Sequence, residues 1–146
     1  MRLLKTVESF LREDGWDFSH LENRSVLKTG YQGEHGSWTC YAQTREEDQQ
    51  FLFYAVCPIR APEKKRAAVA EYLTRANYGM VIGNFEMDYA DGEIRFKTSI
   101  DVEDAELADR RLRDLADQGA EVEALAGPPG RLDQVRQQHV LARRER

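Results

Sequence analysis

The sequence predicts an α+β fold: a five-stranded antiparallel sheet with flanking helices, in the order α-β-β-β-α-β-β-α. Two observations predict this fold. Near the start and in the middle of the chain, apolar residues recur at helical spacing. The segments that follow these two stretches have the apolar and aromatic content of β-strands. Polar turns between the strand-like segments favour antiparallel hairpins. At 146 residues the chain is long enough to form one hydrophobic core without disulfides or metal.

The first helix is predicted over residues 2–13, where the apolar side chains share one face and Asp14-Gly15 provides a stop. The next three elements are predicted to be antiparallel strands joined by short polar turns: Ser25–Gln32, Ser37–Thr44 and Gln50–Cys57. The third strand lacks polar alternation, so both of its faces are expected to be covered.

A second helix is expected to start at Pro62, because proline suits the first turn of a helix. Asn77 and Gly79, which both tolerate positive φ, are expected to end it. Its apolar stripe is formed by residues at the spacing i, i+3, i+4 and i+7: Val69, Tyr72, Leu73 and Ala76.

The segments Asn84–Tyr89 and Glu93–Ile100 both alternate, and Asp91-Gly92 lies between them. Asp-Gly favours a two-residue type I′ turn. Such a turn predicts these opposing pairs: Ala90 with Glu93, Tyr89 with Ile94, Asp88 with Arg95, Met87 with Phe96 and Glu86 with Lys97. One side of the hairpin is then apolar, and the other places acidic side chains opposite basic ones.

Three regions are expected along the chain. Residues 1–103 form the core domain, residues 104–126 form a C-terminal helix that completes or flanks it, and residues 127–146 form a Gly/Pro break and a basic tail. Residues 131–146 carry five Arg against Asp133 and Glu145, a charge of +3. This leaves −8 for the rest of a chain whose formal net charge is −5.

The composition argues against export, membrane insertion and general attraction to nucleic acid. The chain starts with helical spacing rather than a continuous apolar segment, and its longest apolar run, Phe51–Cys57, is too short to span a bilayer. A negative net charge opposes phosphate binding. Cys40 and Cys57 fit reduced thiols, so a soluble cytoplasmic protein is expected.

Few residues suggest catalysis, and we expect no enzyme activity, no cofactor and no metal. The three histidines, His20, His35 and His139, are predicted to lie in a loop, a turn and the tail. Cys40 has His35 near it in sequence but is better explained as a buried strand residue. Glu86, Asp88 and Asp91 form an acidic group, which the opposing Lys97 and Arg95 explain as an ion-pair face.

The apolar run of Tyr78, Met80, Val81 and Ile82 lies between a helix end and a strand. It is interpreted as core; any exposed part of it is the candidate protein-binding patch. A basic tail at 131–146 supports an alternative, a nucleic-acid-associated accessory protein, although the tail lacks interleaved aromatic residues. A small-molecule or enzyme role would need a polar pocket beside the sheet.

Residues 57–102 contain the strings CPIRAPEKKRAAVAEYLTRANYG and MVIGNFEMDYADGEIRFKTSIDV, and GYQGEHGSWTCYAQ stands upstream. Over about residues 3–103 the chain resembles the bacterial YbjN-domain family. The resemblance implies a fold like that of type III secretion chaperones, commonly dimeric, and a role in sensory transduction or stress regulation. It implies no catalytic residue. Five residues match the family's turn and cap positions: Asn77, Gly83, Asn84, Asp91 and Gly92. From about Asp104 the sequence departs from the family pattern.

The sequence therefore predicts a non-catalytic protein-binding module, chaperone-like or regulatory, that forms a homodimer and binds another protein.

Overall fold

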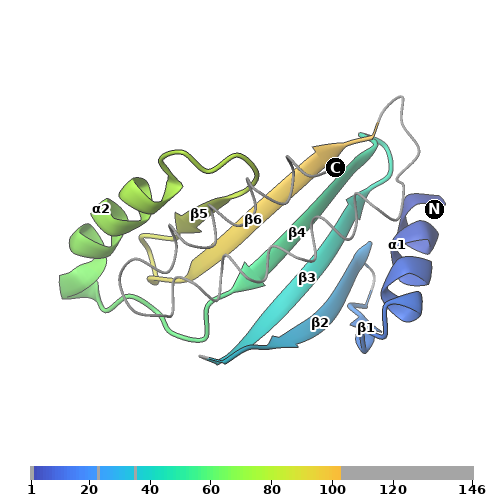
Figure 1. Ribbon diagram of the computed structural model, residues 1–146, viewed down its shortest axis with the longest axis horizontal. Helices are drawn as coiled ribbons and strands as arrows, with labels where there is room; N and C mark the ends of the chain where they lie inside the picture. Colours follow the sequence, from blue (N-terminus) through green and yellow to red (C-terminus); the bar gives the residue numbers. More distant parts are fainter. Residues whose placement is uncertain (1, 23, 35, 103–146) are drawn as a thin grey trace, which may run out of the picture.

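The computed structural model describes residues 2–22, 24–34 and 36–102. In these residues, helices accompany a six-stranded antiparallel sheet (Figure 1), which confirms the α+β class. The helices are α1 (Arg2–Glu13), the 3₁₀ helix η1 (Glu63–Lys65) and α2 (Arg66–Asn77). The strands are β1 (Phe18–His20), β2 (Val26–Gln32), β3 (Ser37–Arg45), β4 (Gln50–Val56), β5 (Asn84–Met87) and β6 (Ile94–Asp101). The expected helix at 104–126 and the tail lie outside the described residues.

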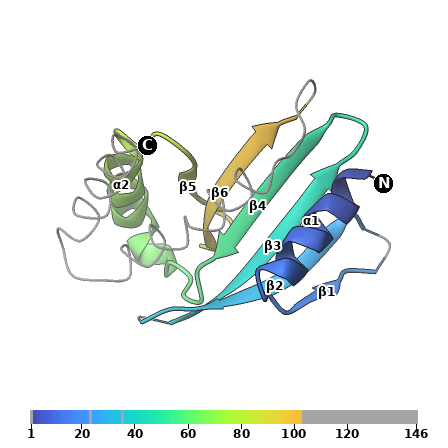
Figure 2. The same ribbon diagram turned by 45° about the vertical axis from the view of Figure 1, so that its right-hand side comes forward.

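The sheet has the strand order β1-β2-β3-β4-β6-β5, and every neighbouring pair is antiparallel. Strands β2, β3 and β4 lie where the sequence predicted three strands. Strand β6 returns alongside β4, so the second hairpin joins the first three strands in one continuous sheet. The two helices lie toward opposite ends of this sheet (Figure 2).

Strand β1 makes the predicted count of five strands wrong. It spans only three residues and pairs with β2, with Phe18 opposite Thr29. The hydroxyl of Thr29 also donates a hydrogen bond to the carbonyl of Asp17, at 2.7 Å. A segment of three residues is too short to show a strand period, so it depends on pairing with β2 and not on a sequence signal.

The predicted register of the β5–β6 hairpin is also wrong, by two residues. Glu86 lies opposite Arg95 and Phe85 lies opposite Phe96. Because the shift is an even number of residues, every side chain stays on its predicted face, and the apolar and charged sides are preserved. The loop is longer than predicted: Asp88 N donates to Glu93 O, and Gly92 N donates to Asp88 O.

The type I′ turn does not form, because it needs positive φ at both central residues and Asp91 does not have it. The carboxylate of Asp88 instead accepts a hydrogen bond from Ala90 N, and that of Asp91 accepts one from Glu93 N. These side-chain bonds stabilise a wider loop, a recognised use of aspartate in turns.

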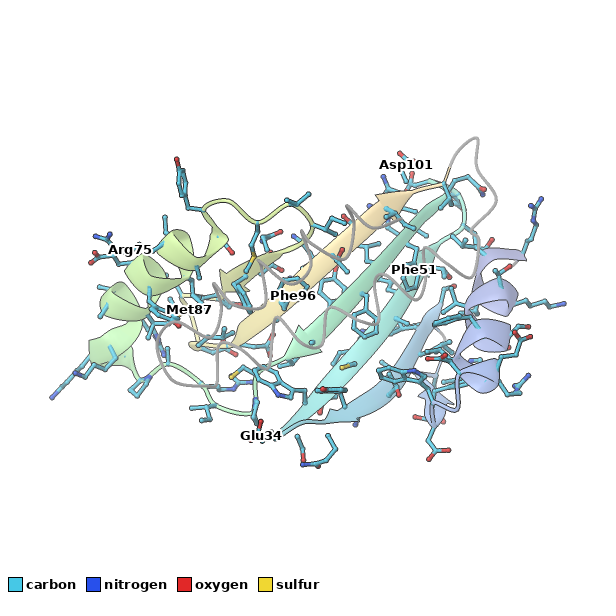
Figure 3. The ribbon with its side chains drawn as sticks, viewed as in Figure 1. Glu34, Phe51, Arg75, Met87, Phe96 and Asp101 are labelled. Carbon is cyan, nitrogen blue, oxygen red and sulfur yellow. The ribbon has the colours of Figure 1, made fainter. Side chains whose placement is uncertain are left out.

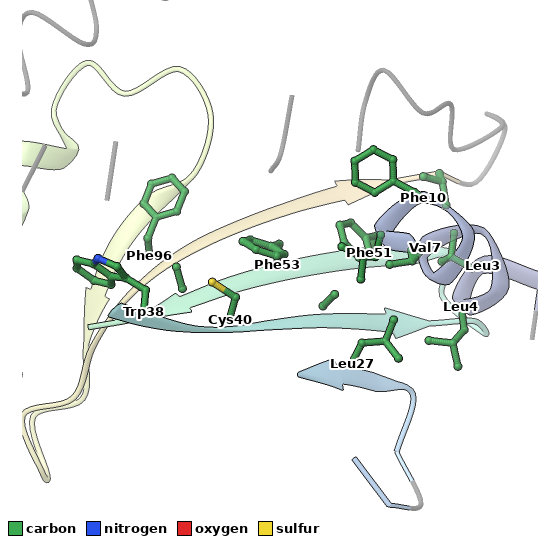
Figure 4. Packing of buried hydrophobic residues seen from close by; sticks show 14 of the residues in the cluster. Leu3, Leu4, Val7, Phe10, Leu27, Trp38, Cys40, Phe51, Phe53 and Phe96 are labelled. Carbon is green, nitrogen blue, oxygen red and sulfur yellow. The ribbon is translucent and has the colours of Figure 1, made fainter. Parts of the chain in front are cut away.

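One apolar cluster forms the core, and it lies on a single face of the sheet. Figure 4 shows Trp38, Cys40, Phe53 and Phe96 standing on the same side of the strands as α1. Helix α1 adds Leu3, Leu4, Val7, Phe10 and Leu11 to this cluster, and α2 adds Leu73 and Ala76. Both helices therefore pack on the same face.

The prediction that both faces of β4 are covered is wrong for the second face. Phe51, Phe53 and Ala55 are buried, whereas the alternate residues between them are only half-buried. Those half-buried side chains, Leu52, Tyr54 and Val56, point away from the core cluster. Their apolar character hid the period of two in the sequence.

Candidate protein-binding surface

Large apolar side chains that remain exposed gather at one end of the described structure. All of them lie between residues 59 and 89, around α2 and the loops beside it, and the most exposed are Tyr78 (86%) and Val81 (78%). The full set is Ile59, Tyr72, Tyr78, Val81 and Tyr89, which we call the α2-end surface. No large apolar side chain of α1 is exposed to this degree. All five residues thus belong to one part of the chain, α2 and the loops before and after it and after β5, and none belongs to β1–β4.

Asn77 fixes the loop that carries Tyr78 and Val81. Its side-chain oxygen accepts a hydrogen bond from Phe85 N at 2.7 Å, and its side-chain nitrogen donates to Phe85 O at 2.9 Å. The last residue of α2 is thereby joined to β5 in the way that one strand pairs with another. This pairing is the role of Asn77, since its φ is not positive and the expected left-handed cap does not form there.

Glycine is required at both bends of this loop. Gly79 and Gly83 have φ of 82° and 73°, in the region that favours glycine. A Cβ at Gly83 would also lie 2.3 Å from the Phe96 ring. Gly83 therefore lets the loop return to the core at Phe96. The bends at the two glycines determine which of the residues between them face the solvent and which face the core.

The predicted patch is divided by this geometry. Tyr78 and Val81 are exposed, Ile82 is half-buried, and Met80 packs against the core cluster. The core interpretation is therefore confirmed for Met80, whereas Tyr78 and Val81 are the exposed part of the run and remain the candidate binding patch. Tyr72, predicted to lie in the buried stripe of α2, is 53% exposed and joins the α2-end surface instead.

Ile59 and Tyr89 lie in two other segments, the one before α2 and the β5–β6 loop, which are bonded to each other. The backbone of Ala61 donates to Gly92 O at 2.8 Å, and Arg66 donates to the carbonyl of Tyr89 at 2.9 Å. Arg60 forms an ion pair with Asp91. Because these contacts tie the segment before α2 to the β5–β6 loop, Ile59 and Tyr89 belong to one fixed structure.

The acidic residues that the sequence analysis grouped together, Glu86, Asp88 and Asp91, all have hydrogen-bond or ion-pair partners. Glu86 binds Arg95 at 2.5 Å and Lys97 at 2.8 Å. Partial burial would raise the pKa of Glu86, but the hydrogen bonds and charges of these two cations outweigh it and lower the pKa. Asp88 bonds to its own loop and does not meet Arg95 as predicted. No group of three or more potential metal ligands occurs in the described residues.

The candidate nucleophile Cys40 is 2% exposed, and burial raises its pKa to about 12, which disfavours the reactive thiolate. The interpretation of Cys40 as a buried strand residue is therefore confirmed. His20 lies 3.5 Å from Glu8 at the surface. His35, His139 and the basic tail at 131–146 lie outside the described residues. Within the described part, no helix is both long and apolar enough to cross a membrane.

The chain is similar in structure to YbjN from E. coli, whose crystal structure is described as that of "a putative transcription regulator". The TM-score is 0.60 at 14% sequence identity, covering 79% of this chain and 81% of the other. A comparison with curated proteins gives no match. The family model YbjN, described as "Putative bacterial sensory transduction regulator", matches residues 3–123, beyond the predicted end of the resemblance at residue 103. The chain therefore belongs to the YbjN family.

Proposed function

We propose that this chain is a non-catalytic protein-binding module with a chaperone-like or regulatory role, and that it binds through the α2-end surface. The observation that carries the proposal is the gathering of all the large exposed apolar side chains of the described residues between residues 59 and 89. The family description as a regulator supports a role exercised through binding. Both described cysteines are free, which supports a reducing compartment such as the cytoplasm.

The composition of this surface fits a protein partner. Tyrosine is enriched at protein interfaces because it buries a large ring and keeps a polar hydroxyl, and three of the five residues are tyrosines. A charged pair lies on the exposed side of the same helix: Glu71 and Arg75 form an ion pair at 2.7 Å, and Figure 3 labels Arg75 there. An apolar centre with a charged rim is the usual arrangement of an interface.

The first partner we expect is a second copy of the chain. In a two-fold dimer the same patch is used by both copies, so a single apolar surface is sufficient. Regulatory binding to another protein would then use the dimer, or would compete with it for the same surface.

Analytical ultracentrifugation at micromolar concentration tests the proposal. The double variant Tyr78→Ser/Val81→Asp should shift the chain from dimer to monomer while the monomer stays folded, because both side chains are exposed and not part of the core. Ser9→Asp, which places a charge on the exposed side of α1, is the matched control and should leave the dimer intact. An affinity pull-down with the same variants measures binding of other proteins. A wild-type chain that is monomeric and captures the same proteins as the double variant would refute the proposal.

A further inference from the structure

A row of side chains crosses the sheet on the face opposite the core. In four adjacent strands, each residue of this row lies directly opposite the next: Lys28 of β2, Tyr41 of β3, Tyr54 of β4 and Lys97 of β6. Two tyrosines are thus flanked by two lysines in a straight line. Strand spacing of about 4.8 Å puts the Cα atoms of the two lysines roughly 14 Å apart.

The described helices do not pack on this row. The neighbours of each tyrosine along its strand, Cys40 and Ala42 on β3 and Phe53 and Ala55 on β4, belong to the buried cluster on the other face. Both α1 and α2 contribute to that cluster. The tyrosine row therefore lies on the half-exposed face, and Lys97 retains 31% of its side-chain exposure there.

Arg95 adds a planar cation to the row. Its guanidinium carbon lies over the Tyr54 ring, 4.6 Å from the ring centroid, which is a cation–π contact. Glu86 binds both Arg95 and Lys97 and thereby fixes their positions. Since Glu86 carries one negative charge against these two cations and Lys28, the centre of this face is positive although the chain as a whole has a net charge of −5.

We propose that this row, Lys28, Tyr41, Tyr54 and Lys97 with Arg95, binds single-stranded nucleic acid. Sheet proteins that bind single strands stack bases on aromatic rings and arginine planes of an open face and hold the phosphates with basic side chains. Here basic side chains flank the two adjacent aromatic ones, and Arg95 lies over the Tyr54 ring. An acidic polypeptide would use the lysines but would gain little from two flat rings, so the tyrosines favour nucleic acid. The surface is distinct from the α2-end surface.

Fluorescence anisotropy of a labelled oligothymidylate of about 16 nucleotides tests this inference with the full chain. At about 50 mM salt the wild-type chain should bind with a Kd between roughly 1 and 100 µM. Tyr41→Leu and Tyr54→Leu should each weaken binding by about 5- to 150-fold, the loss expected for one stacked base. Tyr41→Phe/Tyr54→Phe, which retains both rings, should bind like the wild type.

The lysines are tested by the salt dependence of binding. Lys28→Gln/Lys97→Gln should reduce the slope of log K against log salt by about 1.4, or about 0.7 for each lost phosphate contact. Lys5→Gln/Lys64→Gln removes two exposed lysines elsewhere and should leave the slope unchanged. If Tyr54→Leu fails to fold, Tyr41→Leu and the two lysine variants still decide the question. Tyr78→Ser/Val81→Asp should bind the oligonucleotide normally, which separates this inference from the proposed function.

Three results would overturn the inference. The first is no binding by the wild-type chain at low salt. The second is unchanged binding by both the leucine and the glutamine variants, which would place any binding elsewhere, such as the tail at 131–146. The third is equal competition by polyglutamate with no effect of the leucine substitutions, which would indicate a site for acidic polypeptides.

Discussion

Helices α1 and α2 are both 12 residues long, but they relate to the core differently. α1 buries five apolar side chains, whereas α2 buries only Leu73 and Ala76 and leaves Tyr72 exposed. A helix that buries its whole apolar stripe contributes mainly to stability. The difference indicates that α1 holds the fold together and that α2 presents a surface.

The two helices are also fixed at opposite ends and by different chemistry. The carboxylate of Glu46, from the β3–β4 turn, accepts hydrogen bonds from Leu3 N at 3.2 Å and Leu4 N at 2.9 Å at the start of α1. The neutral amide of Asn77 holds the end of α2. Of these two attachments, only the one at α1 depends on an ionisable group; the charged side chain that holds α2, Arg66, acts at the start of that helix.

The largest effect we expect is from Phe96→Ala, at the junction between the sheet and the α2 end. Phe96 is 1% exposed and packs edge-to-face on Phe85 at 5.0 Å, so its removal leaves a cavity. The free energy of unfolding should fall by roughly 3–5 kcal/mol. Urea titration measures this, and Tyr89→Ala, at an exposed aromatic residue, is the control. A negligible change would mean that Phe96 is not in the core.

Leu11→Ala and Tyr72→Ala test the contrast between the helices directly. Leu11 is buried, so its truncation should cost about 2–5 kcal/mol. Tyr72 is exposed, and its truncation should change stability by no more than about 0.5 kcal/mol. Urea titrations of both variants measure the costs. Equal losses of unfolding free energy would contradict the comparison, since α2 would then contribute as much to stability as α1.

Gly92→Ala should destabilise the loop beside the α2 end. Gly92 has a φ of 78°, and an added Cβ would lie 2.1 Å from Ala61 O. We expect a loss of about 1–3 kcal/mol from the strained backbone alone. Gly15→Ala is the control, because Gly15 has a similar φ but open space around its Cβ. Thermal unfolding should show a larger shift for Gly92; equal shifts would contradict the contact with Ala61.

The smallest effect concerns the pH dependence of α1. Partial burial raises the pKa of Glu46, but hydrogen bonds from Leu4 N and Leu3 N outweigh it and lower the pKa below its usual range. The stabilisation is therefore present above the unfolded pKa of about 4.3 and is lost as the pH falls through the lower folded value. Glu46→Gln should cost about 0.3–1 kcal/mol at pH 7 and nearly nothing in strong acid.

Urea titrations of Glu46→Gln at a series of pH values measure this difference, with the exposed neighbour Glu47→Gln as control. A cost that stays constant down to strong acid would mean that the charge of Glu46 does not contribute to the attachment of α1.

The sequence predicted α1 and β2 to β4 well because their signals are local. Apolar spacing alone defines the stripe of α1, and β-branched and aromatic residues between polar turns define the strands. The faces of the β5–β6 hairpin were also predicted, since the alternation of Phe85 and Met87 fixes which side is apolar. The register was not, because the wide loop depends on side-chain bonds of Asp88 and on the distant Ala61.

The candidate surface was predicted only in part for a related reason. Periodicity assigns Tyr72 to an apolar stripe, but it does not show how far the sheet extends beneath that stripe. Tyr78, Met80 and Val81 are alike in composition, and the bends at Gly79 and Gly83 determine which of them face solvent. The Lys-Tyr-Tyr-Lys row could not be predicted, because it arises from the pairing of four strands.

The two hydrogen bonds between Asn77 and Phe85 have a consequence for how this family member could diversify. These bonds join the end of α2 to the start of β5, so residues 78–84 form a loop that is closed at its two ends. The outward side chains of the loop take no part in these bonds. Positions 78 and 81 are therefore free to change identity without loosening α2 or β5. A chain built this way can acquire new binding preferences by substitution at the tip while its scaffold stays the same.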